Sequence, residues 1–341
     1  MFLEKDKEME EPHMIEHVLQ TLPQVIIDGL ALGAVYAIVA LGYTMVYGIL
    51  ELINFAHGEI FMTGAFVGTA LLLSFSAFGW LSSMPMLLAL LLVLVATSIV
   101  TGLLGMGIER IAYRPLRNAP KLITLITAIG ISFLLQDFVR FITELKKGNY
   151  ILTGPSLFTG QVNISASSIW SGFHDASVKS SFFIVLVTAV VMMVTLDFFV
   201  NKTKWGMAMR AVAQDRETAA LMSVNVNKVI ALTFFIGSAL GGATGVLFAI
   251  QYGTIDPYIG FILGLKAFTA AVLGGIGNIR GAMFGGIVLG LLEMFAAANL
   301  PIVSDGILGA EYKDVFAFSI LIIVLIFKPE GLFGKVSVEK V

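Results

Sequence analysis

Four polar or ionisable residues lie close together in a chain that is apolar for long distances on either side. Glu51, Asn54, His57 and Glu59 separate the apolar runs 22–50 and 60–78. A helix that faces lipid does not carry such a cluster, because an ionisable group near the bilayer centre costs about 2.5–3.5 kcal/mol on insertion scales. The segment therefore predicts either a discontinuous helix lining a polar path across a membrane, or a loop between two spans that dips into the headgroups.

The spacing within this segment narrows its geometry. Asn54 follows Glu51 by three residues and Gly58 follows Asn54 by four, so the three share one helical face. Glu59 falls on a different face, together with Thr63. Polar positions on two faces predict a helix that breaks near Gly58, or one that is surrounded by other helices.

A lysine and a threonine lie one turn apart on a second short apolar segment. Asp256 followed by proline predicts the start of a helix over 257–273, about 25 Å long and short for a full span. The ammonium of Lys266 needs a carboxylate or carbonyl partner there, or must reach the interface. Glu51, Glu59 and Glu293 are the candidate partners. We expect Lys266, with Thr269 beside it, to form a structural ion pair or line a gate, in preference to binding a substrate carboxylate.

A short amphipathic segment lies between two later apolar runs. Asp215 is suited to cap a helix over 216–223. Its polar side carries Arg216 and Glu217, and its apolar side carries Ala219, Leu221 and Met222. Such a helix between two spans can dock onto a soluble partner. A surface loop folded back on the bilayer is the alternative.

Composition indicates an integral membrane protein made of helices. Of 341 residues, 57% are hydrophobic and 13% are charged, about half the charged share of soluble domains. The apolar runs are long and uninterrupted, whereas the strands of a membrane barrel alternate over about ten residues. We predict an all-α, polytopic transmembrane helical bundle of eight or nine membrane segments, some of them discontinuous.

Several classes of chemistry are excluded or disfavoured. A net charge of −2 implies no nucleic-acid partner, and the absence of cysteine excludes disulfides and zinc–thiolate sites. The four histidines are scattered, so we expect no metal site. No GxxxxGK[ST] loop occurs, and no Ser/His/Asp set stands in plausible relation, so we expect the chain not to be an enzyme.

The charges between the apolar runs predict the topology. Loops 109–121 and 201–228 are basic and are expected on the cytoplasmic side, with 144–180 and 300–314 outside. We expect an acidic tail over 1–20, a transmembrane domain over 21–334 and a C-terminal tail over 335–341. Each half also has a polar break, 54–59 and 278–280, followed by a stripe of glycines. This pattern fits two internal repeats framing a substrate path, or chance glycine spacing.

Two long motifs carry a resemblance to a known family. One runs from Gly33 to Gly48 and continues at 53–59, and the other runs from Lys266 to Gly277 and continues at 281–286. They resemble the LivH type of permease, which belongs to ABC importers for branched-chain amino acids. The resemblance extends from about Leu22 to the C-terminus.

The resemblance implies a function and a set of partners. The chain would be the permease subunit of such an importer in a bacterial inner membrane, moving leucine, isoleucine and valine by ATP-driven alternating access. The partners would be a second homologous permease, two cytoplasmic ATPase subunits that bind the ATP, a periplasmic substrate-binding protein and membrane lipid. The chain itself would need no cofactor.

The resemblance also suggests roles for the singled-out residues. The translocation path or its gate would involve Asn54, His57, Gly58, Glu59, Lys266 and Thr269. The ATPase-coupling helix would comprise Asp215, Arg216, Glu217, Ala219, Ala220, Leu221 and Met222. Glu217, Ala219 and Ala220 loosely match the acidic-Ala-Ala start of the family's coupling segment. The glycine common a few residues later is replaced by Ser223 and Val224, which weakens the match at the level of residues.

Three alternatives stay open. The same architecture could carry urea, short amides or other amino acids. A secondary transporter or channel would need a coupling-ion site, for which Glu51, Glu59 and Glu293 are the candidates. A structural membrane scaffold would not depend on the polar residues 54–59 at all.

Overall fold

The computed structural model describes residues 2–50, 54–117, 119–168 and 173–334, with side chains from Glu16 onward. Glu51 and the predicted tail 335–341 lie outside the described residues, so what was expected of them stays a prediction. Seven long helices dominate the fold. They are α1 (Phe2–Leu50), α2 (Ala56–Ala77), α4 (Met86–Ile108), α5 (Lys121–Lys147), α6 (Ser180–Lys202), α9 (Val226–Tyr252) and α11 (Ile279–Val303).

Shorter elements connect these helices. The short helices are α3 (Trp80–Ser83), α7 (Lys204–Gln214), α8 (Arg216–Leu221), α10 (Ile259–Gly274) and α12 (Lys313–Phe327), with single turns η1 (Glu109–Tyr113), η2 (Ala166–Ser168) and η3 (Ala310–Tyr312). Strand β1 (Leu152–Thr153) pairs antiparallel with β4 (Thr254–Ile255), and β2 (Gln161–Ile164) pairs antiparallel with β3 (Ala176–Lys179). Ser177 lies opposite Asn163 in the second pair.

The polytopic all-α bundle predicted from the sequence is confirmed. Among the described residues, seven helices are long and apolar enough to cross a membrane. Helix α10 is apolar but has only 16 residues, and α12 has 15. The chain is therefore a multi-pass membrane protein, and the expected eight or nine segments correspond to seven long helices and these two short ones.

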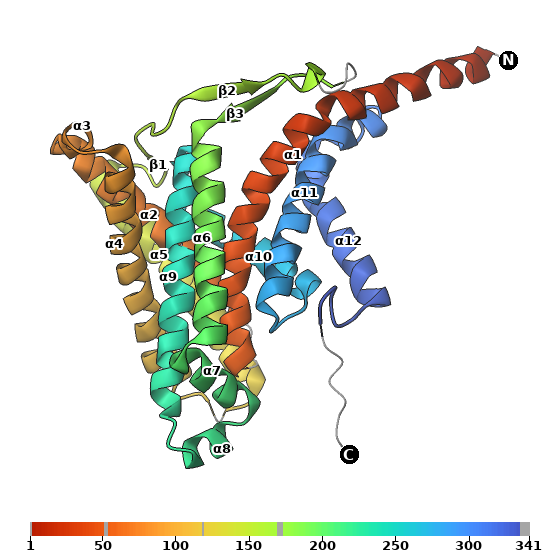
Figure 1. The fold of residues 1–341 in the computed structure, drawn as a ribbon. Coiled ribbons are helices and arrows are strands. Elements are labelled where there is room, and N and C mark those ends of the chain that lie inside the picture. Colours follow the sequence, from red (N-terminus) through yellow and green to blue (C-terminus); the bar gives the residue numbers. More distant parts are fainter. Residues whose placement is uncertain (1, 51–53, 118, 169–172, 335–341) are drawn as a thin grey trace.

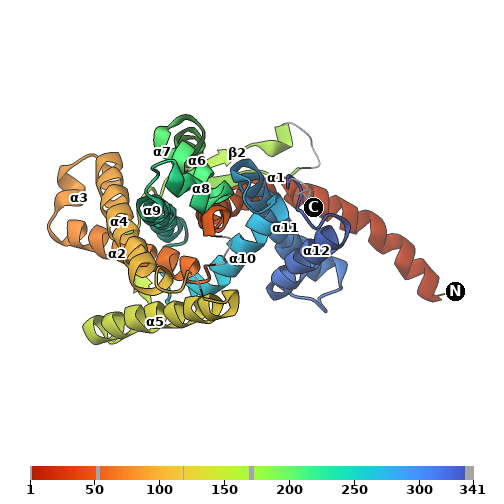
Figure 2. The ribbon, with the colours of Figure 1, turned by 90° about the horizontal axis from the view of Figure 1, so that it is seen from below.

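The elements gather at two ends of the bundle (Figure 1). Strands β2 and β3 cross the top, which we call the hairpin end, and α7 and α8 lie at the bottom, which we call the basic end. Helices α2, α4, α5 and α9 form one side, and α1, α10, α11 and α12 form the other (Figures 1 and 2). Arg117 of the first basic loop donates to Asn227 of the second, so the two basic loops meet at this end, and their cytoplasmic side stays a prediction.

Small residues allow the closest helix crossings. Helix α1 packs most extensively on α11, while α2 and α4 pack on α9. Where α1 crosses α11, a Cβ on Gly290 would collide with the backbone of Gly33, and one on Gly286 would collide with Ala37. Glycines at such positions let backbones approach in lipid, where dispersion and not the hydrophobic effect drives helix association.

Of the two geometries predicted around Gly58, a helix broken there is wrong and a helix surrounded by other helices is confirmed. The first turn of α2 is buried, and the helix packs against α4, α5, α9 and α10. Helix α1 ends at Leu50 and α2 begins at Ala56, so Gly58 lies inside the first turn of α2. Its missing side chain serves packing, because a Cβ there would collide with the carbonyl oxygen of Gly260 on α10. The discontinuity precedes the glycine.

Several predicted boundaries also shift. The expected tail 1–20 is the N-terminal part of α1, which projects from the bundle (Figure 1). The π turn η1 extends α4 into the predicted loop 109–121, and α11 runs through Pro301 into the loop predicted at 300–314. Helix α10 starts at Ile259, because the carboxylate of Asp256 instead accepts the backbone N–H of Tyr258 at 2.7 Å, in the turn before the helix. Loop 144–180 contains β1, β2 and β3 between α5 and α6.

Candidate functional site

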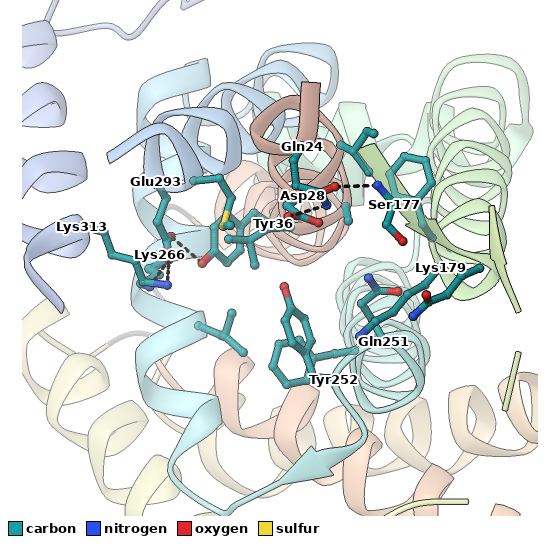
Figure 3. Close-up of a pocket in the computed structure, with 18 residues that line it drawn as sticks. Gln24, Asp28, Tyr36, Ser177, Lys179, Gln251, Tyr252, Lys266, Glu293 and Lys313 are labelled. Atoms are coloured by element: carbon teal, nitrogen blue, oxygen red, sulfur yellow. Dashed lines mark hydrogen bonds and ion pairs between the residues drawn. The ribbon is translucent and has the colours of Figure 1, made fainter. Parts of the chain in front are cut away.

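A cavity of about 660 Å³ opens towards the hairpin end of the bundle. Its wall is formed by α1, α9, α10 and α11, with β2 and β3 along one side and the start of α12 on the other (Figure 3). We call it the hairpin-end cavity. Its volume lies within the roughly 300–1,000 Å³ usual for small-ligand sites.

One wall of this cavity carries a network of four charges. Lys266 of α10 contacts Glu293 of α11 at 2.8 Å and Asp314 of α12 at 2.7 Å, and Lys313 contacts Glu293 at 3.0 Å. The hydroxyl of Tyr36 on α1 donates to Glu293 at 2.7 Å. Two cations and two anions balance, which removes the cost of an isolated charge among membrane helices.

This network answers the question of what pairs with Lys266. Its partners are Glu293 and Asp314, not Glu59. The structural ion pair expected of Lys266 is present, and its side chain also lines the cavity. Three helices are fastened together at this point, because α10, α11 and α12 each contribute a charge.

The opposite wall is polar but differently organised. Gln24 of α1 donates its amide N–H to Asp28 at 2.9 Å and accepts the backbone N–H of Ser177 on β3 at 3.0 Å. Lys179 of β3 and Gln251 of α9 complete this side (Figure 3). The sequence signals for these residues were a charge inside the first apolar run, at Asp28, and a basic residue at the end of the long polar loop. Neither was interpreted as part of a site.

Four of the predicted path residues lie elsewhere. Asn54, His57, Gly58 and Glu59 do not line the hairpin-end cavity. His57 is 1% exposed and fills a space left by glycines, since a Cβ on Gly42 would collide with its ring. Tyr43 meets the same ring edge-on at 4.8 Å between centroids. These contacts make His57 part of the packing between α1, α2 and α9.

Glu59 is buried, and no cation among the residues that the structure describes pairs with it. It is 1% exposed, and Ser132 of α5 donates to its Oε1 at 3.2 Å. Its Oε2 has no hydrogen-bond partner among the described residues and lies against Gly260 of α10. Thr269 is also buried, and it donates to the carbonyl oxygen of Leu265 one turn earlier. The structure therefore brings Lys266 alone of the six predicted path residues to the cavity.

The short helix predicted after Asp215 is confirmed as α8, two residues shorter than expected. The Asp215 carboxylate accepts the backbone N–H groups of Glu217 and Thr218 at 2.9 and 3.2 Å. The hydrogen bond from the Thr218 hydroxyl, together with these two backbone bonds, holds the pKa of Asp215 below its ordinary value. Ala219 is buried against the bundle, whereas Leu221 and Met222 are 85% and 75% exposed. Two large apolar side chains thus project from the basic end.

A second cavity, of about 350 Å³, lies between the α7–α8 corner, the start of α5 and the inner ends of α1 and η1. Arg216 crosses towards α1 and donates to the carbonyl oxygen of Ile49 at 2.9 Å. Tyr113 of η1 also lines it and donates to Asn54 at 2.6 Å. The first residue of α8 is therefore bonded directly to the last turn of α1.

A buried carboxylate anchors the same region and was not singled out in the sequence. Glu109 is fully buried and pairs with Arg114 at 3.4 Å and with Arg117. Burial lowers the pKa of the Arg117 guanidinium, and the Glu109 carboxylate opposes that shift. The available signal was a single acid among four basic residues in a loop, which suggested only the sidedness of the loop.

The chain matches known proteins along almost its whole length. The family described as "Branched-chain amino acid transport system / permease component" matches residues 25–325. The chain is 43% identical to the high-affinity branched-chain amino acid transport system permease protein LivH of Escherichia coli K12, and 42% identical to LivH of Salmonella typhimurium. In both cases the match covers 96% of this chain and 100% of the relative.

A third relative is the permease protein BraD of the corresponding system of Pseudomonas aeruginosa. It is 42% identical over 96% of this chain and 99% of its own length. No solved structure gives a significant match to the chain.

Proposed function

The chain belongs to the family of permease components of branched-chain amino acid transport systems, and on that premise we propose that it is the membrane subunit of a bacterial ABC importer for leucine, isoleucine and valine. The observation that carries the proposal is the match along nearly the whole chain to permeases named for this transport. The chain would lie in the inner membrane, with its basic end in the cytoplasm, as the excess of lysine and arginine there favours.

The hairpin-end cavity supports the transport role. It opens at the end opposite the basic loops, and it penetrates to Lys266 and Glu293, which are both buried. In the proposed cycle a periplasmic binding protein delivers substrate over β2 and β3, and the cavity receives it. The cavity is the outward half of the path.

The inner half of the path is closed by packed polar side chains. Asn54, His57, Gly58, Glu59 and Thr269 lie in or beside the contacts among α1, α2 and α10, and we assign them to the gate that must open towards the cytoplasm. The gate has a physical basis, because one oxygen of Glu59 has no hydrogen-bond partner in the part of the chain that the structure describes and His57 is packed against Gly42 and Tyr43. Both groups would gain water contacts when these helices separate.

Helix α8 is suited to receive the ATPase. Leu221 and Met222 offer an exposed apolar contact beside the acidic Glu217, and Arg216 links the helix to the end of α1. Closure of two ATPase subunits on ATP would move α8, and the bond from Arg216 to Ile49 would pass that movement to the last turn of α1. A second, homologous permease chain would complete the transmembrane assembly. ATP would be bound by the partners only.

The proposal is tested by reconstitution. The purified chain is placed in liposomes with a homologous partner permease, two ATPase subunits and the binding protein, and uptake of labelled leucine is followed. We expect uptake that needs ATP and every component. Uptake driven by an ion gradient without ATP would favour a secondary transporter, with Glu59 as the first coupling carboxylate to test. Uptake of urea or other amino acids in preference to leucine would show that the chain transports a different substrate in the same architecture.

The partners are tested separately. Detergent-solubilised chain is used to recover bound proteins, with and without the double change Glu217→Lys/Met222→Asp on α8. Recovery of an ATPase pair and a second permease, with the ATPases lost in the variant, supports the importer and places the coupling helix. Recovery of the chain alone contradicts the assembly.

A further inference from the structure

Two opposite charges face the hairpin-end cavity without forming an ion pair. Asp28 lies on α1 and Lys179 lies on β3, and no residue that the structure describes pairs its charge with either. The other charges of the cavity, on Lys266, Glu293 and Lys313, satisfy one another. The half-buried Asp28 carboxylate and the Lys179 ammonium therefore lie on the same wall, and both are available to a ligand.

The acceptors on this wall are held in place. Gln24 donates to one oxygen of Asp28, and its own amide oxygen is occupied by the backbone N–H of Ser177, so Gln24 cannot turn away. The amide oxygen of Gln251 is buried and has no donor among the described residues. A buried acceptor without a partner is costly, and a ligand with several N–H donors would remove that cost. A primary ammonium carries three.

Between this wall and the wall that carries the Lys266–Glu293 network, the cavity is lined by apolar side chains. These side chains are aliphatic, thioether and aromatic, and among them are Ile27, Leu32, Phe182, Phe248, Leu263 and Met294. Tyr252 points its hydroxyl into the cavity from the α9 side (Figure 3). Two charges without counter-ions lie along one wall, apolar surface lies beside them, and the charges of the opposite wall neutralise one another. This distribution complements a molecule with two charged groups and a hydrocarbon chain.

We propose that the hairpin-end cavity is a binding site for the zwitterion of an aliphatic α-amino acid. Asp28 and Gln251 receive the ammonium group, Lys179 receives the carboxylate, and the aliphatic side chain packs on the apolar wall. This assignment rests on the proposed transport function and gives the permease a selectivity of its own. Binding is weak, because Lys179 is exposed at the rim and its attraction is screened by water and salt.

Weak binding of this kind is measurable by saturation-transfer NMR on the permease–ATPase complex in nanodiscs, without the binding protein. The probes are leucine, 4-methylpentanoate, which lacks the ammonium, leucinamide, which lacks the carboxylate, and glycine, which lacks the side chain. Leucine is expected to bind about tenfold or more tightly than each of the other three. Equal binding of all four overturns the proposal.

Two substitutions assign the two charges. Asp28→Asn should abolish the preference for leucine over 4-methylpentanoate and leave the preference over leucinamide. Lys179→Met should do the converse. Asp137→Asn and Lys146→Met, at exposed charged positions on α5, are matched controls and should leave both preferences unchanged. Variants that keep both preferences show that these two residues do not hold the zwitterion.

The same preparations separate this proposal from the transport function. Uptake of leucine by the complete wild-type importer is measured in parallel with the binding experiment. ATP-driven uptake by a permease whose cavity fails to discriminate the four probes overturns the binding site and leaves the function standing. Failure of uptake for every branched-chain amino acid overturns the function itself.

Discussion

The hydroxyl of Tyr113 donates a 2.6 Å hydrogen bond to the side-chain oxygen of Asn54, and both residues are buried. Tyr113 ends the π turn that extends α4, whereas Asn54 lies between α1 and α2. One bond thus joins two parts of the basic end that are far apart in sequence. Because Arg216 reaches the last turn of α1 nearby, movement of α8 would act on this same junction.

Tyr113→Phe should destabilise the protein and loosen this junction. The change leaves the side-chain oxygen of Asn54 buried without a donor, and the amide nitrogen of Asn54 already lacks a partner among the described residues. An unsatisfied buried polar group costs about 1–3 kcal/mol. Thermal unfolding in detergent measures the loss. Tyr312→Phe, at an exposed tyrosine, is the control, and equal shifts for the two variants would refute a role for the bond.

Arg216→Gln should uncouple ATP hydrolysis from transport. The variant loses the bond to the carbonyl oxygen of Ile49 but keeps the exposed face of α8. We expect the assembled importer to retain its ATPase subunits and hydrolyse ATP while leucine uptake falls several-fold. Hydrolysis and uptake are measured in the same liposomes. Lys228→Gln, an exposed cation at the same end, should change neither rate.

Leu221→Asp provides the contrasting outcome on the same helix. This side chain is 85% exposed and does not connect α8 to the bundle, so its change should release the ATPase subunits and stop both activities. If Arg216→Gln also releases the ATPases, Arg216 belongs to the docking contact and not to the transmission of movement.

The cap of α8 should be lost only under acid conditions. Hydrogen bonds from Thr218 and the backbone at Glu217 lower the pKa of Asp215 below its ordinary value of 3.8. A depressed folded-state pKa means that the stabilisation is complete above the ordinary value and disappears as pH falls through the lowered one. Amide exchange at Glu217 and Thr218, corrected for its intrinsic pH dependence, should therefore show constant protection from pH 7 to about 5.

Asp215→Asn keeps a capping oxygen without the titrating charge and is the matched variant. It should retain protection at the pH where the parent loses it. Loss of protection in the parent between pH 7 and 5 would mean that another group controls α8.

Local sequence rules predicted the elements of the basic end well. Asp215 was identified as a cap because a carboxylate followed by a short amphipathic run has few other uses, and the structure contains that cap. Hydropathy alone located the long helices, since a span of lipid requires an apolar run of about 20 residues. The resemblance of two motifs then indicated the family, which the match along residues 25–325 establishes.

The candidate site was harder to predict, because its residues meet only in space. Asp28, Lys179 and Gln251 come from three distant parts of the chain, and no periodicity links them. The polar cluster at 54–59 looked like a path because its residues are polar. Sequence could not show that Gly42 and Gly241 leave room for His57, or that α5 and α10 cover Glu59. The polar residues at 54–59 indicated that this segment is buried among helices. They did not show whether those residues face a cavity or are packed between helices.

Gly290→Ala should destabilise the protein although alanine is the better helix former. A Cβ on Gly290 would collide with the backbone nitrogen and Cα of Gly33, where α1 crosses α11. Backbone cannot rotate aside as a side chain does, so the helices must separate, and overpacking of this kind costs about 1–3 kcal/mol. Gly107→Ala on α4 is the matched control, since nothing lies within 4 Å of its added Cβ.

Helix propensity alone predicts that both alanines stabilise the protein, by roughly 0.5–1 kcal/mol each. The close crossing of α1 and α11 instead predicts that the two substitutions change stability differently. Gly107→Ala should be neutral or stabilising, whereas Gly290→Ala should be destabilising. Unfolding of the two variants in one detergent, measured by the loss of helical circular dichroism on heating, distinguishes these outcomes. Tyr36 and Glu293 each lie three residues from this contact, on opposite sides of it because α1 and α11 cross antiparallel. Separation of the two helices should therefore also weaken their 2.7 Å hydrogen bond. Leucine uptake should then fall in Gly290→Ala and persist in Gly107→Ala. Equal stability and equal uptake in the two variants would show that the close approach of α1 and α11 does not contribute to the stability of the protein.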